Sequence, residues 1–236
     1  MAKEVVVKAS TIAKRKKRYQ KTKLTISIVL LILIFSFIIL SVIYKGGRFT
    51  ITLDPRLSTD NRIVIYEDNE IKESKRKLVA RDLDFMDNIS IDWIPQNIDT
   101  EANGSHNGEN YIAYTFYIEN EGEETINYWY MVLIDDVIKN VDEAARVMIY
   151  KNGEKTVYAK TNSLTNEAEK DTKPFFSKDK AVVEQRKRFA PGDVDKYTIV
   201  IWLEGDDPDC TDNILGGEIK MHMEIREEYY ETKENE

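Results

Sequence analysis

An uninterrupted apolar run constrains this chain more than any other feature. It extends from Leu24 to Tyr44, reads LTISIVLLILIFSFIILSVIY, and has 21 residues with no charge and only threonine and serine as polar interruptions. As a helix it would be roughly 31 Å long, which matches the hydrocarbon core of a bilayer. A buried helix of a soluble protein would keep a polar face, and this run has none. The run therefore predicts a single transmembrane helix in direct contact with membrane lipid.

The flanking charges predict the orientation of this helix. Seven lysines and arginines lie between Ala13 and Lys23, directly before the apolar run, whereas only Lys45 and Arg48 follow it closely. Because positive flanks stay on the cytoplasmic side, we expect the N-terminus in the cytoplasm and the C-terminal domain outside the cell. The exit of the run has bulky or charged residues where a signal peptidase needs small ones. We therefore expect an uncleaved signal anchor in the plasma membrane.

The charge and the cysteine content limit the classes of function and fold that this chain can have. Residues 1–23 carry nine basic residues and one glutamate, a local charge of +8, so the remainder must carry −16 for the total of −8. So acidic a domain lacks the basic surface that nucleic-acid binding requires, and we expect no nucleic acid among its partners. The single cysteine, Cys210, excludes an intramolecular disulfide framework, which suits export by a Gram-positive cell.

Beyond the span, short runs of alternating apolar and polar residues predict β-strands. Such runs, separated by turn clusters, indicate a mostly β fold, an antiparallel β-sandwich at residues 45–226 with an acidic tail at 227–236. The polar segments Gln96–Asn110 and Thr161–Lys180 are expected to be loops, and Asp135–Val147 a short helix. The expected strands are Arg48–Leu53, Arg62–Tyr66, Asn88–Trp93, Tyr111–Glu119, Ile126–Ile134, Ala145–Tyr150, Glu154–Ala159, Lys196–Leu203 and Glu218–Arg226.

Two local patterns support this assignment. Asn152-Gly153 separates two alternating runs, and both residues tolerate the positive φ of a tight hairpin turn. The stretch INYWYMVLI, from Ile126 to Ile134, is apolar on both faces, which predicts a central strand covered on each side. Its aromatic residues are therefore expected to pack in the core, although a ligand platform is an alternative.

The acidic linker between the last two expected strands is the main candidate for a binding site. It contains Asp206, Asp207, Asp209 and Asp212, and converging carboxylates could hold calcium. Pro208 and the flanking strands favour the other interpretation, a solvated turn with its acids pointing outward. In that case, replacing Asp207 and Asp209 by asparagine would leave folding unchanged. The same two interpretations apply to Asp193 and Asp195, which enter the preceding strand.

Catalytic and cofactor motifs are absent from the sequence. His106 lies in a glycine-rich and asparagine-rich loop and His222 on the polar face of the last strand, so no histidine pair has metal-ligand spacing. The chain has no nucleophile elbow, no phosphate-binding glycine loop, and no histidine near its cysteine. We expect no catalytic residue and no cofactor other than the calcium considered above.

The order of the motifs resembles a known group of proteins. The segments FTITLD, FMDNISIDW, NYIAYTFYIEN and INYWYMVLIDDVIKN, after a basic tail and an apolar run, resemble uncharacterised membrane-anchored surface proteins of Firmicutes. The segment PGDVDKYTIVIWLEGDDPDC and the later ILGGEIKMHMEI are similar to the ending of the camelysin and biofilm-matrix fibre family. That likeness implies a jelly-roll-like sandwich, but it transfers no catalytic residue because the family has no metal motif to match here.

These observations predict a membrane-anchored cell-surface protein with a non-enzymatic role in structure, adhesion or assembly of the envelope or matrix. Its partners would be other surface or envelope proteins. The alternatives are a camelysin-like metal-dependent surface peptidase and an accessory membrane subunit of an envelope or secretion machine. Fibres of the family imply strand addition between subunits, but the four residues after Tyr44 span at most roughly 14 Å. We therefore expect Phe49–Leu53 to pair within its own domain and the anchored protein to form no long filaments.

Overall fold

The computed structural model describes residues 9–45, 48–59, 62–83 and 85–227 and divides into two compact units. The first unit is Met1–Gly47 and the second is Arg48–Glu236, so the boundary lies three residues beyond the expected end of the span. The acidic tail expected at 227–236 lies outside the described residues except for Glu227. Each unit is described by itself below.

The described residues of the first unit form one helix, α1 (Ala9–Lys45), of 37 residues. It includes the basic segment as well as the apolar run, because lysine, arginine and alanine are good helix formers. The stretch Lys14–Leu40 is long and apolar enough to cross a membrane, and none of it is buried within the protein. The hydroxyl groups of Thr22, Thr25 and Ser27 donate to carbonyl oxygens four residues earlier, each at 3.0 Å. Each hydroxyl group thus forms a hydrogen bond within the helix, as polar groups must where water is absent.

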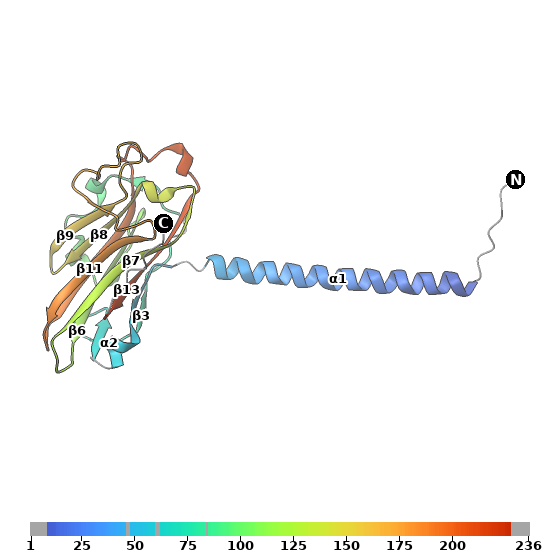
Figure 1. The fold of residues 1–236 in the computed structure, drawn as a ribbon, viewed down its shortest axis with the longest axis horizontal. Coiled ribbons are helices and arrows are strands. Elements are labelled where there is room, and N and C mark those ends of the chain that lie inside the picture. Colours follow the sequence, from blue (N-terminus) through green and yellow to red (C-terminus); the bar gives the residue numbers. More distant parts are fainter. Residues whose placement is uncertain (1–8, 46–47, 60–61, 84, 228–236) are drawn as a thin grey trace, which may run out of the picture. The chain divides into compact units, whose positions relative to one another are not determined.

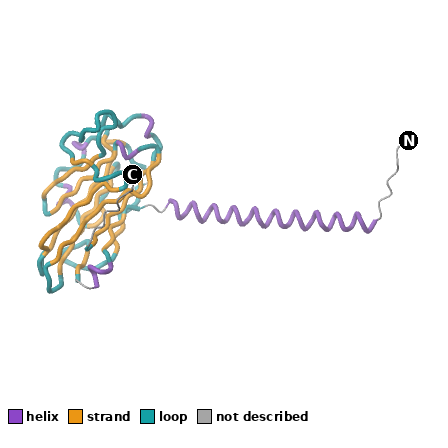
Figure 2. The backbone as a smooth tube through the Cα atoms, viewed as in Figure 1, coloured by secondary structure: helices purple, strands orange, loops and turns teal. Residues whose placement is uncertain are grey.

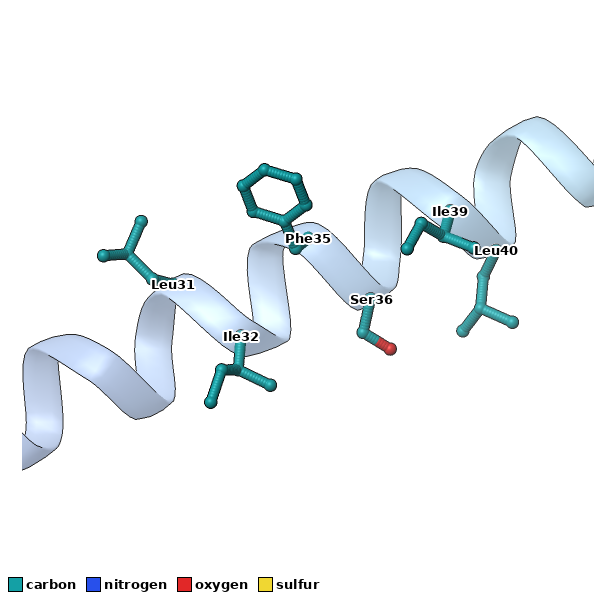
Figure 3. A pocket seen from close by; sticks show the side chains of 6 residues that line it. All are labelled: Leu31, Ile32, Phe35, Ser36, Ile39 and Leu40. Carbon is teal, nitrogen blue, oxygen red and sulfur yellow. The ribbon is translucent and has the colours of Figure 1, made fainter.

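Figure 3 shows part of the surface of α1, where five of the six side chains drawn are apolar and the sixth is Ser36. Two rows with four-residue spacing, one of Leu31, Phe35 and Ile39 and one of Ile32, Ser36 and Leu40, border a shallow groove. Residues four apart lie one above the other on a helix, which explains the two rows. All five apolar side chains of the groove are more than half exposed.

The second unit consists of two β-sheets (Figures 1 and 2). One sheet has five strands in the order β11-β7-β13-β1-β3. Neighbouring strands of this sheet are antiparallel, except that β1 and β13 are parallel. The bounds of its strands are β1 Thr50–Leu53, β3 Lys77–Val79, β7 Ile126–Ile138, β11 Lys180–Phe189 and β13 Glu218–Arg226.

The other sheet has eight strands, six of them in the order β10-β9-β8-β12-β6-β2, with β4 paired to β12 and β5 to β6. Its bounds are β2 Ile63–Tyr66, β4 Asn88–Ile89, β5 Gly104–Ser105, β6 Tyr111–Asn120, β8 Ala145–Lys151, β9 Glu154–Ala159, β10 Lys173–Pro174 and β12 Val194–Glu204. The short helices are α2 Pro55–Thr59, η1 Ile91–Trp93, α3 Ile98–Glu101, η2 Val141–Glu143 and η3 Asp212–Ile214.

The main core lies between the two sheets. Strand alternation sends one face of each long strand inward, including Tyr130 of β7, Phe116 of β6 and Tyr197 of β12. The Tyr197 ring stacks on Phe116 with centroids 5.4 Å apart and meets Tyr130 edge-on at 5.2 Å. The fold class expected from the sequence, a mostly β domain preceded by one apolar helix, is therefore confirmed. The jelly-roll connectivity stays a prediction.

A second, smaller core covers the outer face of the eight-stranded sheet. The segment from β4 to α3 places Ile89, Ile94 and Ile98 against Met148 of β8 and Trp202 of β12. Trp202 is fully buried here, whereas its neighbour Ile201 belongs to the main core. The rim of this second core forms one wall of the cleft described below.

Several local expectations are confirmed. Asn152 and Gly153 form the turn between β8 and β9 with φ values of 52° and 86°. Strand β1 pairs with β13 and β3 of its own domain, as the short tether predicted. Strand β7 lies inside its sheet, and Tyr128 and Tyr130 pack in the main core, but the expected cover on its other face is incomplete, because Trp129 and Leu133 are only partly buried.

Three expectations are wrong. The segment Asp135–Val147 is not a helix, because β7 continues to Ile138 by pairing with β13, and a turn leads through η2 into β8. The sheets are mixed rather than purely antiparallel, since β1–β13, β9–β10 and β4–β12 are parallel pairs. The segment Asn88–Trp93 is a strand only at β4 and then becomes η1.

Candidate functional site: an acidic loop beside a mixed-charge cleft

The acidic loop, residues 205–212, follows β12 and contains a buried ion pair. Asp207 is only 5% exposed and accepts a hydrogen bond from Nη2 of Arg146 on β8, which is 4% exposed. Asp207 also accepts a bond from the backbone N–H of Asp209 at 2.7 Å. The expectation of a solvated turn with all acids pointing outward is therefore wrong for Asp207. Alternation along β8 sends Arg146 to the outer face of the sheet, where this buried cation requires a counter-charge.

Glu204, the last residue of β12, joins three segments at the same place. It is 8% exposed, and its Oε2 accepts hydrogen bonds from Trp202 Nε1 at 3.0 Å and from the Ile91 N–H at 3.1 Å. Its Oε1 accepts a bond from the Asp206 N–H at 3.3 Å. Glu204 therefore connects the second core, the segment after β4 and the acidic loop.

Three carboxylates, two of them from the acidic loop itself, lie close together. One oxygen from each of Glu169, Asp207 and Asp209 lies within 4.8 Å of the others. Asp209 accepts hydrogen bonds from the Ser163 N–H at 2.8 Å and from Ser163 Oγ at 2.5 Å. Of the four aspartates considered for calcium, the structure thus brings Asp207 and Asp209 together and adds Glu169. Asp206 and Asp212 are exposed and do not belong to this group.

The donor set only partly meets the demands of calcium, which prefers six to eight oxygen ligands. Asp207 already neutralises Arg146, Asp209 already binds Ser163, and Glu169 accepts a bond from Asn162 Nδ2 at 3.1 Å. The calcium site stays a prediction. The sequence could not identify Glu169, because it lies in a polar loop without periodicity and far from the linker along the chain.

A cleft of about 510 Å³ opens beside the acidic loop. Its walls come from the segment after β4, the outer face of β8 and β9, the loop at 169–172 and the acidic loop. A smaller cavity of about 210 Å³ shares Ile91, Asp92 and Lys155 with it. The loops at this end of the strands are gathered together in Figure 1. The charged residues that line the larger cleft include Asp92, Arg146, Lys155, Glu169, Glu204 and Asp207.

The other acids considered from the sequence have structural partners. Asp195 is 1% exposed and accepts hydrogen bonds from Tyr128 Oη at 2.6 Å, Arg186 Nε at 2.9 Å and Asn152 Nδ2 at 2.9 Å. Burial raises the pKa of Tyr128 well above its ordinary value, so this hydroxyl stays a donor. Asp193 accepts a bond from Arg186 Nη2 at 3.1 Å. This network lies in the main core, away from the cleft lining.

The two histidines lie apart from the three-carboxylate group. His106 Nε2 contacts Thr115 Oγ1 at 2.9 Å, and burial lowers the pKa of its imidazole. His222 contacts Asp135 at 2.7 Å and Glu224 at 3.3 Å on the outer face of the five-stranded sheet. Hydrogen bonds with these carboxylates, first Glu224 and then Asp135, raise the pKa of His222.

Comparisons with models of protein families, with curated proteins and with solved structures return no match for this chain.

Proposed function

We propose that the protein is a membrane-anchored surface protein of a Gram-positive cell, with a non-enzymatic role in adhesion or in assembly of the envelope or matrix. The observation that carries this proposal is the unburied stretch Lys14–Leu40 of α1, joined to a separate compact β unit. In water so large an apolar surface would aggregate, whereas a bilayer covers it. The basic flank favours a cytoplasmic N-terminus and an external domain.

The edges of the sandwich favour contacts through loops and clefts over strand addition. Among the described edge strands, β10 is two residues long and ends in Pro174, β3 has three residues and β2 has four. Strand β11 is a longer edge, but its register is irregular at both ends, and Lys187 and Arg188 lie near its end. Short strands, proline, irregular register and basic side chains all discourage edge-to-edge pairing. These features support the expectation that the anchored protein forms no long filaments.

The test uses the full-length chain expressed in a Gram-positive host. We expect the protein to stay in the membrane fraction after carbonate washing and the β domain to be digested by protease added to protoplasts. The matched control replaces Ile32 and Phe35 by arginine, each at a cost of about 3 kcal/mol in the middle of the span. This variant should leave the membrane fraction. A wild-type protein that is carbonate-soluble, or whose β domain resists external protease, would overturn the proposal.

The same preparation tests the alternative roles. Stable co-purification of membrane proteins with the full-length chain would favour an accessory subunit of an envelope machine. Hydrolysis of a peptide library, abolished by a chelator, would favour the metal-dependent peptidase.

A further inference from the structure

The cleft gathers charged groups that the fold itself does not use. The carboxylates of Asp92, Asp171 and Asp206 have no ion-pair or hydrogen-bond partner in the described part of the chain, and neither do the ammonium groups of Lys155 and Lys170. All five residues are exposed and line the cleft. Buried charges of both signs, Arg146, Asp207 and Glu204, lie beside them. The lining therefore offers unused donors and acceptors next to each other.

We propose that this cleft binds the uncharged sugar units of a glycan. A sugar hydroxyl both donates and accepts hydrogen bonds, so neighbouring hydroxyls can donate to a carboxylate and accept from an ammonium group. Such bonds to ionised groups are roughly twice as strong as bonds between neutral groups. Ile91 and Val157 add apolar wall surface for the C–H faces of a sugar ring. The volume of about 510 Å³ lies within the range of small-ligand sites.

The charge balance of the lining argues against two other ligand classes. Six carboxylates face three cationic side chains, so an anionic ligand such as a phosphate would meet net repulsion. A divalent cation would need the oxygens of Glu169, Asp207 and Asp209, which already bind Asn162, Arg146 and Ser163. A neutral polyhydroxylated ligand avoids both conflicts. The inference rests on the proposed function only for the source of the glycan, which would be the cell envelope.

The test measures binding by the full-length chain in phosphatidylcholine nanodiscs, because detergents with sugar headgroups would compete. The probes are chitotetraose, cellotetraose and maltotetraose, titrated by calorimetry and by ligand-observed NMR up to 10 mM, a ceiling set near the roughly millimolar limit of weak binding. We expect at least one of them to bind. The variant Asp92→Asn/Lys155→Met should weaken that binding at least tenfold, because these two residues line both cavities.

The matched control is Asp212→Asn/Lys178→Met, which changes the same residue types at exposed positions outside the cleft lining. It should bind as the wild type does, and both variants should keep the wild-type melting temperature. Binding of none of the three glycans, or equal binding by both variants, would overturn the proposal. A calcium-induced rise in melting temperature that Glu169→Gln abolishes, without glycan binding, would also overturn it and assign a cation site. Fractionation tests the membrane anchor separately, so failure of one proposal is distinguishable from failure of the other.

Discussion

Asp195 and Asp207 are two buried carboxylates close to opposite ends of the same strand, β12, and their surroundings differ. Asp195 faces the space between the two sheets and receives donors from β7, β11 and the turn after β8. Asp207 lies on the outer side of the eight-stranded sheet and pairs with Arg146 and its own loop. The first carboxylate is enclosed by the core, and the second lines a cleft.

This difference separates a structural acid from a candidate functional one. Both oxygens of Asp195 accept bonds from protein donors, so its network joins the sheets and leaves no room for a ligand. Asp207 pairs with Arg146, but it also lines a cleft together with charged side chains that have no partner among the described residues, such as Asp92 and Lys155. Burial of an aspartate is therefore no evidence of function by itself. The informative observation is whether unused polar groups lie beside it.

The largest expected effect follows from removing the enclosed carboxylate. Asp195→Ala leaves the Arg186 guanidinium without its partner in the core, so we expect a loss of about 4 kcal/mol in the free energy of unfolding. Urea denaturation followed by tryptophan fluorescence measures it. The control Asp193→Ala removes a more exposed partner of the same arginine and should cost less than about 1 kcal/mol. Equal losses for the two variants would show that Asp195 is not the structural centre of the network.

A smaller effect is expected at the cleft, because Asp207 accepts hydrogen bonds from one side chain and one backbone N–H. Asp195, in contrast, accepts bonds from three side chains. Asp207→Leu leaves Arg146 unpaired and should cost about 3 kcal/mol, whereas Arg146→Met/Asp207→Leu removes both charges and should cost less than the single change. A double-mutant cycle by urea denaturation measures the coupling. We expect this loss because of the buried ion pair, in place of the expectation that Asp207 can be replaced with folding unchanged. If the double variant is less stable than Asp207→Leu, the ion pair does not account for the burial of Asp207.

Much of the fold could be predicted because alternation is a local property of the chain. Strands such as β6 and β13 show it clearly, and the turn at Asn152-Gly153 requires only two residues. Strand β11 was missed because its inward side chains include Glu184 and Arg186, which break the apolar pattern. Glu184 accepts a hydrogen bond from Tyr158 and Arg186 donates one to Asp195, and both partners lie on the facing sheet, which the local pattern does not reveal.

The site was less predictable for the same reason. The four aspartates of the linker indicate a candidate binding site, but no local pattern predicts which of them is buried. Asp207 is buried because Arg146, 61 residues earlier, emerges beneath it from β8. The helix expected at Asp135–Val147 is a second example of a local pattern that long-range contacts override. Glu143–Arg146 are good helix formers, but pairing of β7 with β13 and of β8 with β12 makes most of the segment extended.

The smallest expected effect concerns a third acidic cluster, on the solvent side of the five-stranded sheet. His222 contacts Asp135 of β7 and Glu224 of its own strand, and these carboxylates raise its pKa above the ordinary value of 6.5. Glu224 also pairs with Arg226, which keeps its charge throughout this range. A raised folded-state pKa stabilises the fold fully below pH 6.5, and this stabilisation is lost as the pH rises through the folded-state pKa.

We therefore expect the wild type to exceed His222→Gln in stability at pH 5.5, by less than about 1 kcal/mol because the pair is partly exposed, and the difference to vanish by pH 8.5. Melting temperatures of both proteins across this range measure it. The comparison must use the difference between the two proteins, because burial lowers the pKa of His106 and this second histidine destabilises both at acidic pH. A difference that grows with pH would contradict the assignment. If burial and the number of side-chain partners together set the energetic weight of each acid, the effects should decrease from Asp195 through Asp207 to the more exposed His222 and its carboxylates.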